Sequence, residues 1–185
     1  HWDLDLWNSD FIKDETFNIE NYNCFFVKNS WKTRKYGSPN LSDALVDSET
    51  ISDFGFIGLK LYKDVIDYHI ENKKNLVVVN DLVEFPVVDN EYIHYVNMKN
   101  SLDVRLLMTI ADNADNFISS GTGPQDLALY YGDTNQVVVT NSDFICGKDV
   151  FFKKIQNIRK KELLFFDMRC DQFDSIVNFL NQSGN

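Results

Sequence analysis

The sequence contains few cysteines, prolines, glycines and histidines. Its 185 residues include 3 Cys, 3 Pro, 8 Gly and 3 His. The cysteines (Cys24, Cys146 and Cys170) are odd in number and show no C-x-x-C spacing. This pattern predicts neither a disulfide framework nor a zinc site, and a reducing cytoplasmic location is expected. The histidines are too dispersed to form a metal site, and we expect His69 and His94 to be structural.

The sequence also has fewer basic than acidic residues and lacks long apolar runs. There are 28 acidic and 18 basic residues, which gives a formal net charge of −10. Nucleic acid is therefore not expected as a partner, because its phosphates would repel such a chain. No segment approaches the roughly 18 consecutive apolar residues of a transmembrane helix. The acidic amino terminus is unlike a signal or transit peptide, and it lacks a starting Met, so we expect processing or a longer parent protein.

The remaining sequence has the composition of a globular protein, with 44% hydrophobic residues and 15 Phe. Residues 1–20 show no period and are expected to be an extension or linker remnant, followed by one domain over 21–185. Runs of Val, Ile, Leu and Phe alternate with amphipathic segments, which predicts an α/β fold: a Rossmann-like parallel sheet of about six strands with helices on both faces. The predicted strands are 23–28, 75–79, 92–96, 116–120, 136–140 and 162–166, and the predicted helices are 57–72, one from Ser101, one opened by Pro124, 148–158 and 171–182.

Two predicted helices carry candidate capping residues. Ser101 is expected to be the N-cap of its helix, with a buried stripe of Leu102, Leu106, Leu107, Ile110 and Ala114. Asp171 and Asp174 are expected at the N-cap and N3 positions of the last helix.

Residues 116–132, "NFISSGTGPQDLALYYG", hold an unusual share of the few glycines and prolines. Pro124 suits the first position of a helix, so the preceding turn presents free backbone N–H groups at the positive helix end. In open α/β sheets, ligands bind beyond the carboxyl ends of strands, and this arrangement predicts an anion site. The hydroxyls of Ser119, Ser120 and Thr122 add donors, and Gly121 and Gly123 lack a Cβ that would keep a phosphate away.

An ordinary strand-to-helix turn accounts for the same composition equally well. Known phosphate motifs do not match: Asp126 stands where a dinucleotide fingerprint has its third glycine, and no lysine follows as in a P-loop. The first glycine of a hydrolase G-x-S-x-G elbow is also missing. Asp126 either complements the helix dipole or contacts a ribose or another hydroxyl.

Residues 110–140, "IADNADNFISSGTGPQDLALYYGDTNQVVVT", resemble the C-terminal half of GT-B glycosyltransferases, especially heptosyltransferase-like enzymes of bacterial surface polysaccharides. The resemblance implies that Ser119, Ser120, Gly121, Thr122 and Gly123 hold the diphosphate of a nucleotide-sugar. It implies basic phosphate contacts after the first strand, from Lys28, Lys32 or Arg34, and a nucleoside site at Val96, Asn97, Met98, Gln125 and Asp126. The family usually has Asp where this chain has Gly121.

By this resemblance the chain is expected to be the donor-binding domain of a GT-B glycosyltransferase acting on a surface glycan. Such an enzyme would be metal-independent and without a cofactor, with the nucleotide-sugar as donor substrate. A glycan or lipid-linked acceptor would bind through a second half, and other parts of the protein would hold it at the membrane periphery. The sequence offers no catalytic pair. The alternative is a non-catalytic Rossmann-like module that binds a nucleotide or a protein; a flavodoxin-like domain is disfavoured, because the Gly/Thr loop follows a late strand.

Overall fold

The computed structural model describes most of the predicted strands and three of the helices. The described residues are 17–28, 57, 59–81, 87–98, 103–120, 125, 128, 133–140, 161–167 and 170–182. The predicted helix at 148–158 and the extension up to residue 16 lie outside them.

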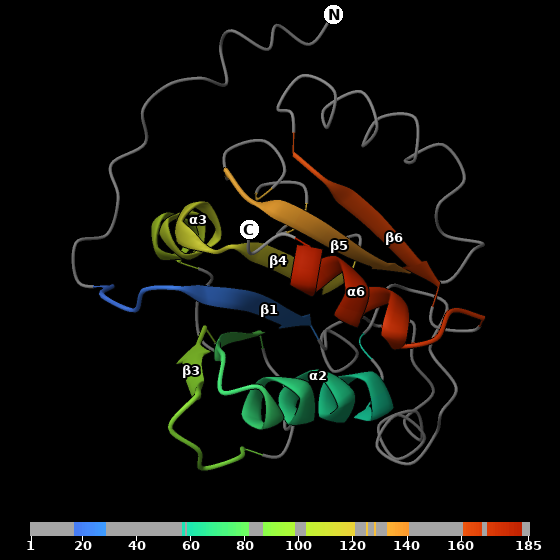
Figure 1. The fold of residues 1–185 in the computed structure, drawn as a ribbon. Coiled ribbons are helices and arrows are strands. Elements are labelled where there is room, and N and C mark those ends of the chain that lie inside the picture. The colour runs from blue at the N-terminus through green and yellow to red at the C-terminus, as the bar shows by residue number, and fades with distance from the viewer. Residues whose placement is uncertain are drawn as a thin grey trace, which may run out of the picture.

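Six parallel strands form a single sheet (Figure 1). Their order is β3-β2-β1-β4-β5-β6, and each neighbouring pair is parallel. The predicted six-stranded, Rossmann-like parallel sheet is therefore confirmed. The strands are β1 Tyr22–Lys28, β2 Asn75–Asp81, β3 Ile93–Asn97, β4 Asn116–Ser120, β5 Asn135–Thr140 and β6 Leu163–Asp167.

Helices cover both faces of the sheet, as the sequence predicted. Alternate residues of a strand point to opposite faces, and in β1 Phe25 belongs to one buried cluster and Phe26 to the other. The cluster of Phe25 includes side chains of α2 (Leu59–Glu71) and α6 (Asp174–Gln182). The cluster of Phe26 includes those of α3 (Val104–Asn113). Figure 1 shows α2 and α6 in front of the sheet.

The helix starts differ from the predicted ones. Asp103, rather than Ser101, is the N-cap of α3, and its carboxylate accepts a hydrogen bond from the Leu106 amide at 3.0 Å. The predicted stripe is buried at Leu107, Ile110 and Ala114, partly buried at Leu106, and outside the described residues at Leu102.

The last helix, α6, begins at Asp174. The carboxylate of Asp171 does not cap it but accepts from the Asp167 amide at 2.7 Å. Several short polar residues near both helix starts are competent caps, and the tertiary path of the chain decides between them.

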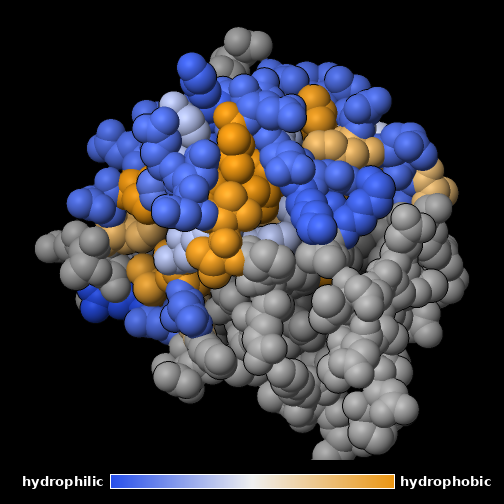
Figure 2. Space-filling model, turned by 90° about the horizontal axis from the view of Figure 1, so that it is seen from below, coloured by the Kyte–Doolittle hydropathy of each residue, from blue (hydrophilic) through white to orange (hydrophobic). Residues whose placement is uncertain are grey.

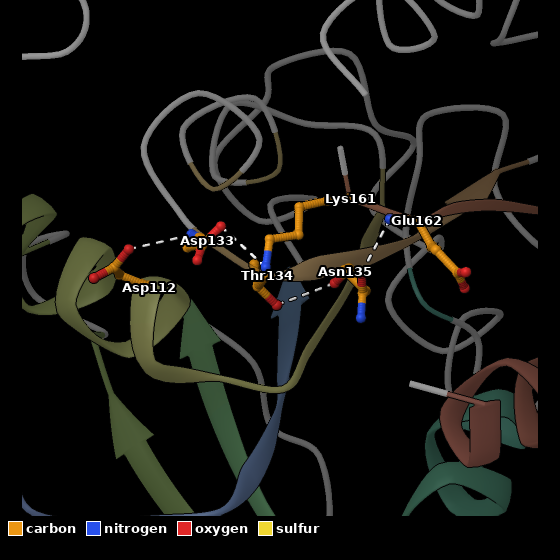
Figure 3. Close-up of polar contacts among 6 residues, drawn as sticks. All are labelled: Asp112, Asp133, Thr134, Asn135, Lys161 and Glu162. Carbon is orange, nitrogen blue, oxygen red and sulfur yellow. Dashed lines mark hydrogen bonds and ion pairs between the residues drawn. The ribbon is translucent and has the colours of Figure 1, made fainter. Parts of the chain in front are cut away.

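Polar contacts tie the amino ends of β5 and β6 to the end of α3 (Figure 3). Asp112 of α3 accepts from the Asp133 amide at 3.1 Å, and the Asp133 carboxylate lies 3.0 Å from the Lys161 ammonium. Asn135 at the start of β5 accepts from the Glu162 amide at 3.0 Å. This edge of the sheet is thus held by side chains as well as by the backbone ladder.

The described surface is mostly hydrophilic. Figure 2, seen from below, shows hydrophilic side chains on either side of a strip of hydrophobic ones. Among the described residues, the large hydrophobic side chains that remain exposed are Val87 (72%) and Val104 (48%). No helix in the described part of the chain is both long enough and apolar enough to span a bilayer.

Candidate functional site

The strand order identifies where a ligand would bind. From β1 the chain continues outward to β2 and β3 on one side, whereas β4, β5 and β6 lie on the other side. Helical residues that follow neighbouring strands β1 and β4 pack on opposite faces, and this arrangement predicts a ligand-binding crevice beyond the carboxyl ends of the two strands. The predicted phosphate-binding residues come from the ends of β1 and β4.

Lys28 is the last residue of β1. In the parallel ladder it pairs with Asp81 of β2. Its backbone therefore lies at the carboxyl edge of the sheet, on the strand next to β4. The side chain of Lys28, together with Lys32 and Arg34, lies outside the described residues.

Ser119 and Ser120 close β4 and are both fully buried. Ser119 pairs with Phe26 of β1, two residues before Lys28. The Ser119 hydroxyl donates to the Ser120 carbonyl at 3.1 Å, so this proton is engaged within the strand. Gly121, Thr122 and Gly123, which complete the predicted loop, lie outside the described residues. The described part of the predicted loop, Ser119 and Ser120, therefore lies inside the core.

A helical segment follows this loop, because Gln125 and Ala128 are both helical. Ala128 is 1% exposed and packs in the same cluster as α3. Gln125 is 0% exposed, and its amide nitrogen donates to the side-chain oxygen of Gln136 in β5. Gln125 is therefore anchored to the sheet through Gln136, which lies level with Phe117 of β4. Asp126 lies outside the described residues.

The predicted nucleoside-binding residues of β3 lie farther along the same edge. Asn97 ends β3 and is exposed, whereas Val96 is partly buried and Met98 is 4% exposed. Because β2 separates β3 from β1, the end of β3 is about 10 Å from β1 at the usual strand spacing. These residues and the phosphate loop form a row along one edge of the sheet. Contact of any of them with a ligand remains a prediction.

The titratable groups near the core are held in their neutral forms. Burial raises the pKa of the Cys24 thiol in β1 well above its usual range, so this thiol is not an activated nucleophile. Burial lowers the pKa of His69 to about 4. Within the described ranges, no three His, Cys, Asp or Glu side chains gather as a metal ion would require.

Sequence reasoning did not identify one polar group of the core. Asn23, His69 and Asn116 form a buried chain of hydrogen bonds at the amino edge of the sheet. They are separated by 46 and 93 residues, and the only sequence signal was an asparagine at the start of a strand that otherwise reads as apolar.

Comparison with known proteins adds one structural likeness. No protein-family model matches the sequence, and no curated protein matches it. The fold is similar to that of a solved structure, E. coli heptosyltransferase WaaC with ADP, with a TM-score of 0.54 and 11% sequence identity. The match covers 89% of this chain and 45% of that chain, so the chain spans less than half the length of WaaC. The described domain therefore has a glycosyltransferase-like, Rossmann-type fold.

Proposed function

We propose that this chain is the nucleotide-sugar-binding domain of a GT-B-type glycosyltransferase acting on a surface glycan. One observation carries the proposal: the β1/β4 crevice predicted by the strand order is bordered by Lys28 and by the Ser119–Ser120 end of β4. The resemblance of the sequence to GT-B glycosyltransferases implies a diphosphate contact at these same positions. The likeness to a heptosyltransferase solved with ADP supports it further.

In this proposal the diphosphate lies at the entrance of the helix that follows β4. Backbone amides of Gly121 to Gly123 and the Thr122 hydroxyl donate to the phosphate oxygens, and Lys28 or Arg34 offsets their charge. Donors already in place stabilise the charge that grows on the diphosphate as the glycosidic bond breaks. Such a scheme needs no metal ion. The base reaches toward the end of β3, near Asn97, with Gln125 and Asp126 on the opposite side.

The acceptor is a glycan or a lipid-linked saccharide held by a second Rossmann-like half, which also supplies the general base. The whole enzyme works in the cytoplasm, and its other parts place it at the membrane periphery. The chain alone binds the donor and transfers no sugar, because the orientation supplied by two halves accounts for about 7–11 kcal/mol of such a barrier.

Thermal denaturation in the presence of UDP, GDP, ADP and CMP tests donor binding, since a ligand of the native state raises the melting temperature. At least one diphosphate is expected to do so, and equally well in EDTA. The series Gly123→Ala and Gly123→Val should reduce the shift progressively, because each added carbon occupies space next to the phosphate. The absence of a shift with any nucleotide at millimolar concentration overturns the proposal.

Transfer is tested with a radiolabelled donor, comparing this chain with a longer one that includes the second half. Donor binding without transfer by the short chain, and transfer by the long one, is the expected result. Binding without transfer by both chains would favour a non-catalytic nucleotide-binding module.

A further inference from the structure

A polar cavity lies at the opposite, amino edge of the sheet, between the ends of α2 and α6. Its volume is about 420 Å³, within the range of small-molecule pockets, roughly 300–1,000 Å³. Its floor consists of the buried residues Asn23, Asn116 and Leu180, which are 5%, 2% and 3% exposed. The surrounding rim is made of Asn21, Lys73, Lys74, Asn75, Asp115 and Asn181.

The floor contains a directed chain of hydrogen bonds. The Val65 carbonyl can only accept, so the His69 Nδ1, 2.7 Å away, carries the proton and donates to it. The neutral ring then accepts at Nε2 from the Asn23 amide nitrogen at 2.9 Å. The Asn23 oxygen accepts from the Asn116 amide nitrogen at 2.8 Å. Because the neutral His69 ring can only accept at Nε2, the orientations of the Asn23 and Asn116 side-chain amides are both fixed.

The chain ends in an acceptor without a donor. The Asn116 Oδ1 is buried and has no hydrogen-bond partner among the described residues. Such an atom costs about 1–3 kcal/mol when it stays unsatisfied, and native structures hold few of them. Rotating the amide would not help, because its nitrogen is needed by Asn23. The missing partner must be a hydrogen-bond donor that comes from outside the described residues.

We propose that this cavity binds a neutral saccharide, one hydroxyl of which donates to Asn116 Oδ1. A hydroxyl both donates and accepts, and so do the side-chain amides of Asn21, Asn75 and Asn181 on the rim. The side chain of Leu180, which is 3% exposed, closes the floor of the cavity on its apolar side.

The charges of the lining favour a neutral ligand over an ion. Lys73 and Lys74 oppose a cation, while Asp115 and the unpaired Asn116 oxygen oppose an anion. The Lys74 ammonium is also already engaged, since it donates to the Tyr68 hydroxyl and to the Asn181 oxygen, each at 3.1 Å.

The cavity is separate from the crevice of the proposed donor site. Asn23 and Lys28 lie near opposite ends of β1, about 17 Å apart at the usual rise of a strand. Saccharide binding here does not depend on the proposed transferase function, and free sugars can therefore test it without any nucleotide.

Saturation-transfer NMR on the full chain tests the proposal, with glucose, galactose, N-acetylglucosamine and myo-inositol as probes. At least one neutral sugar is expected to bind with a millimolar dissociation constant, and saturating nucleoside diphosphate should not displace it. Binding of none of the probes overturns the proposal, as does competition by inorganic phosphate or methylammonium.

Two variants locate the binding. Asn116→Leu removes the acceptor and should weaken sugar binding more than tenfold. Because this change also removes a hydrogen bond within the core, a second variant replaces only rim residues: Asn21 and Lys73 have positive φ angles of 52° and 54°, so Asn21→Gly with Lys73→Gly suits the backbone. The double variant should stay folded and bind sugar several-fold more weakly. Unchanged binding in the rim variant, or in a folded Asn116→Leu protein, overturns the assignment.

Discussion

The two ends of β1 differ in how they use polar residues. At the amino end, Asn23 is locked between His69 and Asn116. At the carboxyl end, Lys28 closes the strand beside the two serines that end β4. The polar side chains at the amino end hydrogen-bond to one another and hold the sheet to α2, whereas the carboxyl end precedes the predicted phosphate-binding residues. We therefore expect substitutions of the hydrogen-bonded residues at the first end to affect folding, and those at the second end to affect nucleotide binding.

Acidification should have the largest effect, and it acts at the amino end. Burial, opposed by the hydrogen bond to Val65 and reinforced by the charge of Lys74, lowers the pKa of His69 from 6.5 to about 4. Between these two pH values the unfolded chain binds a proton at this ring and the folded chain does not, so falling pH favours unfolding. The loss approaches about 3 kcal/mol at pH 4, at about 1.4 kcal/mol per pKa unit.

Urea denaturation at a series of pH values measures this loss. Many acidic groups titrate in the same range, so the comparison is with His69→Gln, whose stability should fall less steeply over the same window. If the unfolding free energy fell equally steeply with pH in both proteins, His69 would have the same pKa in the folded and in the unfolded chain.

Asn23→Ala should have the next largest effect. It leaves the buried Asn116 nitrogen without its acceptor and the His69 Nε2 without its donor, which costs about 1–3 kcal/mol of unfolding free energy. The melting temperature should fall, yet the shift caused by a nucleoside diphosphate should be the same size as in the unchanged protein. If a folded Asn23→Ala protein showed no nucleotide-induced shift in melting temperature, the amino end of β1 would also contribute to nucleotide binding.

Lys28→Ala is the matched change at the other end of the same strand. Loss of one charged contact to phosphate should weaken nucleoside diphosphate binding about tenfold, since hydrogen bonds to charged groups contribute about 1.5–3 kcal/mol. The unfolding free energy should change by less than it does in Asn23→Ala, because no buried hydrogen-bonded chain is broken. Titration calorimetry measures the first quantity and urea denaturation the second. Full affinity in the variant would remove Lys28 from the proposed site and leave Arg34 and Lys32 as the candidate cations.

Lys161→Ala should have the smallest effect. The ion pair with Asp133 spans 3.0 Å, but the two side chains are 33% and 71% exposed, and such pairs contribute about 0.2–1 kcal/mol. Urea denaturation at low and at high salt should show a small loss that salt reduces further. A loss of unfolding free energy well above this range would mean that Lys161 stabilises the fold through more than its ion pair with Asp133.

The sequence predicted the parts of the fold that depend on local pattern. Continuous apolar runs such as Leu76 to Val79 located the strands, and the amphipathic pattern of residues 57–72 located α2, because burial imposes these periods directly. The order of the strands could not be read this way, since pairing across the sheet depends on contacts far apart in the chain. The helix cap at Asp103 and the start of α6 at Asp174 were misplaced by two or three residues, because neighbouring polar residues are nearly equivalent as caps.

The same distinction between local sequence patterns and contacts of distant residues applies to the candidate sites. The serines that end β4 and the glycines that follow it could be singled out because they are contiguous in the sequence, and His69 was rightly expected to be structural. The chain from His69 through Asn23 to Asn116 could not be foreseen, because three isolated polar residues on α2, β1 and β4 become neighbours only after the sheet has assembled.

The central place of β1 has a consequence for how the chain folds during synthesis. Of the six described strands, the one made first finally lies between β2 and β4, and each later one joins an outer edge of those already made. A growing chain, extending by about 5–20 residues per second, thus never has to open a finished pair to insert a new strand. Until Phe117 emerges and meets Cys24, however, one side of β1 lacks the described strand that finally pairs with it. An open strand edge readily pairs with another chain, so the stage before β4 appears is when the nascent protein most needs protection from its neighbours.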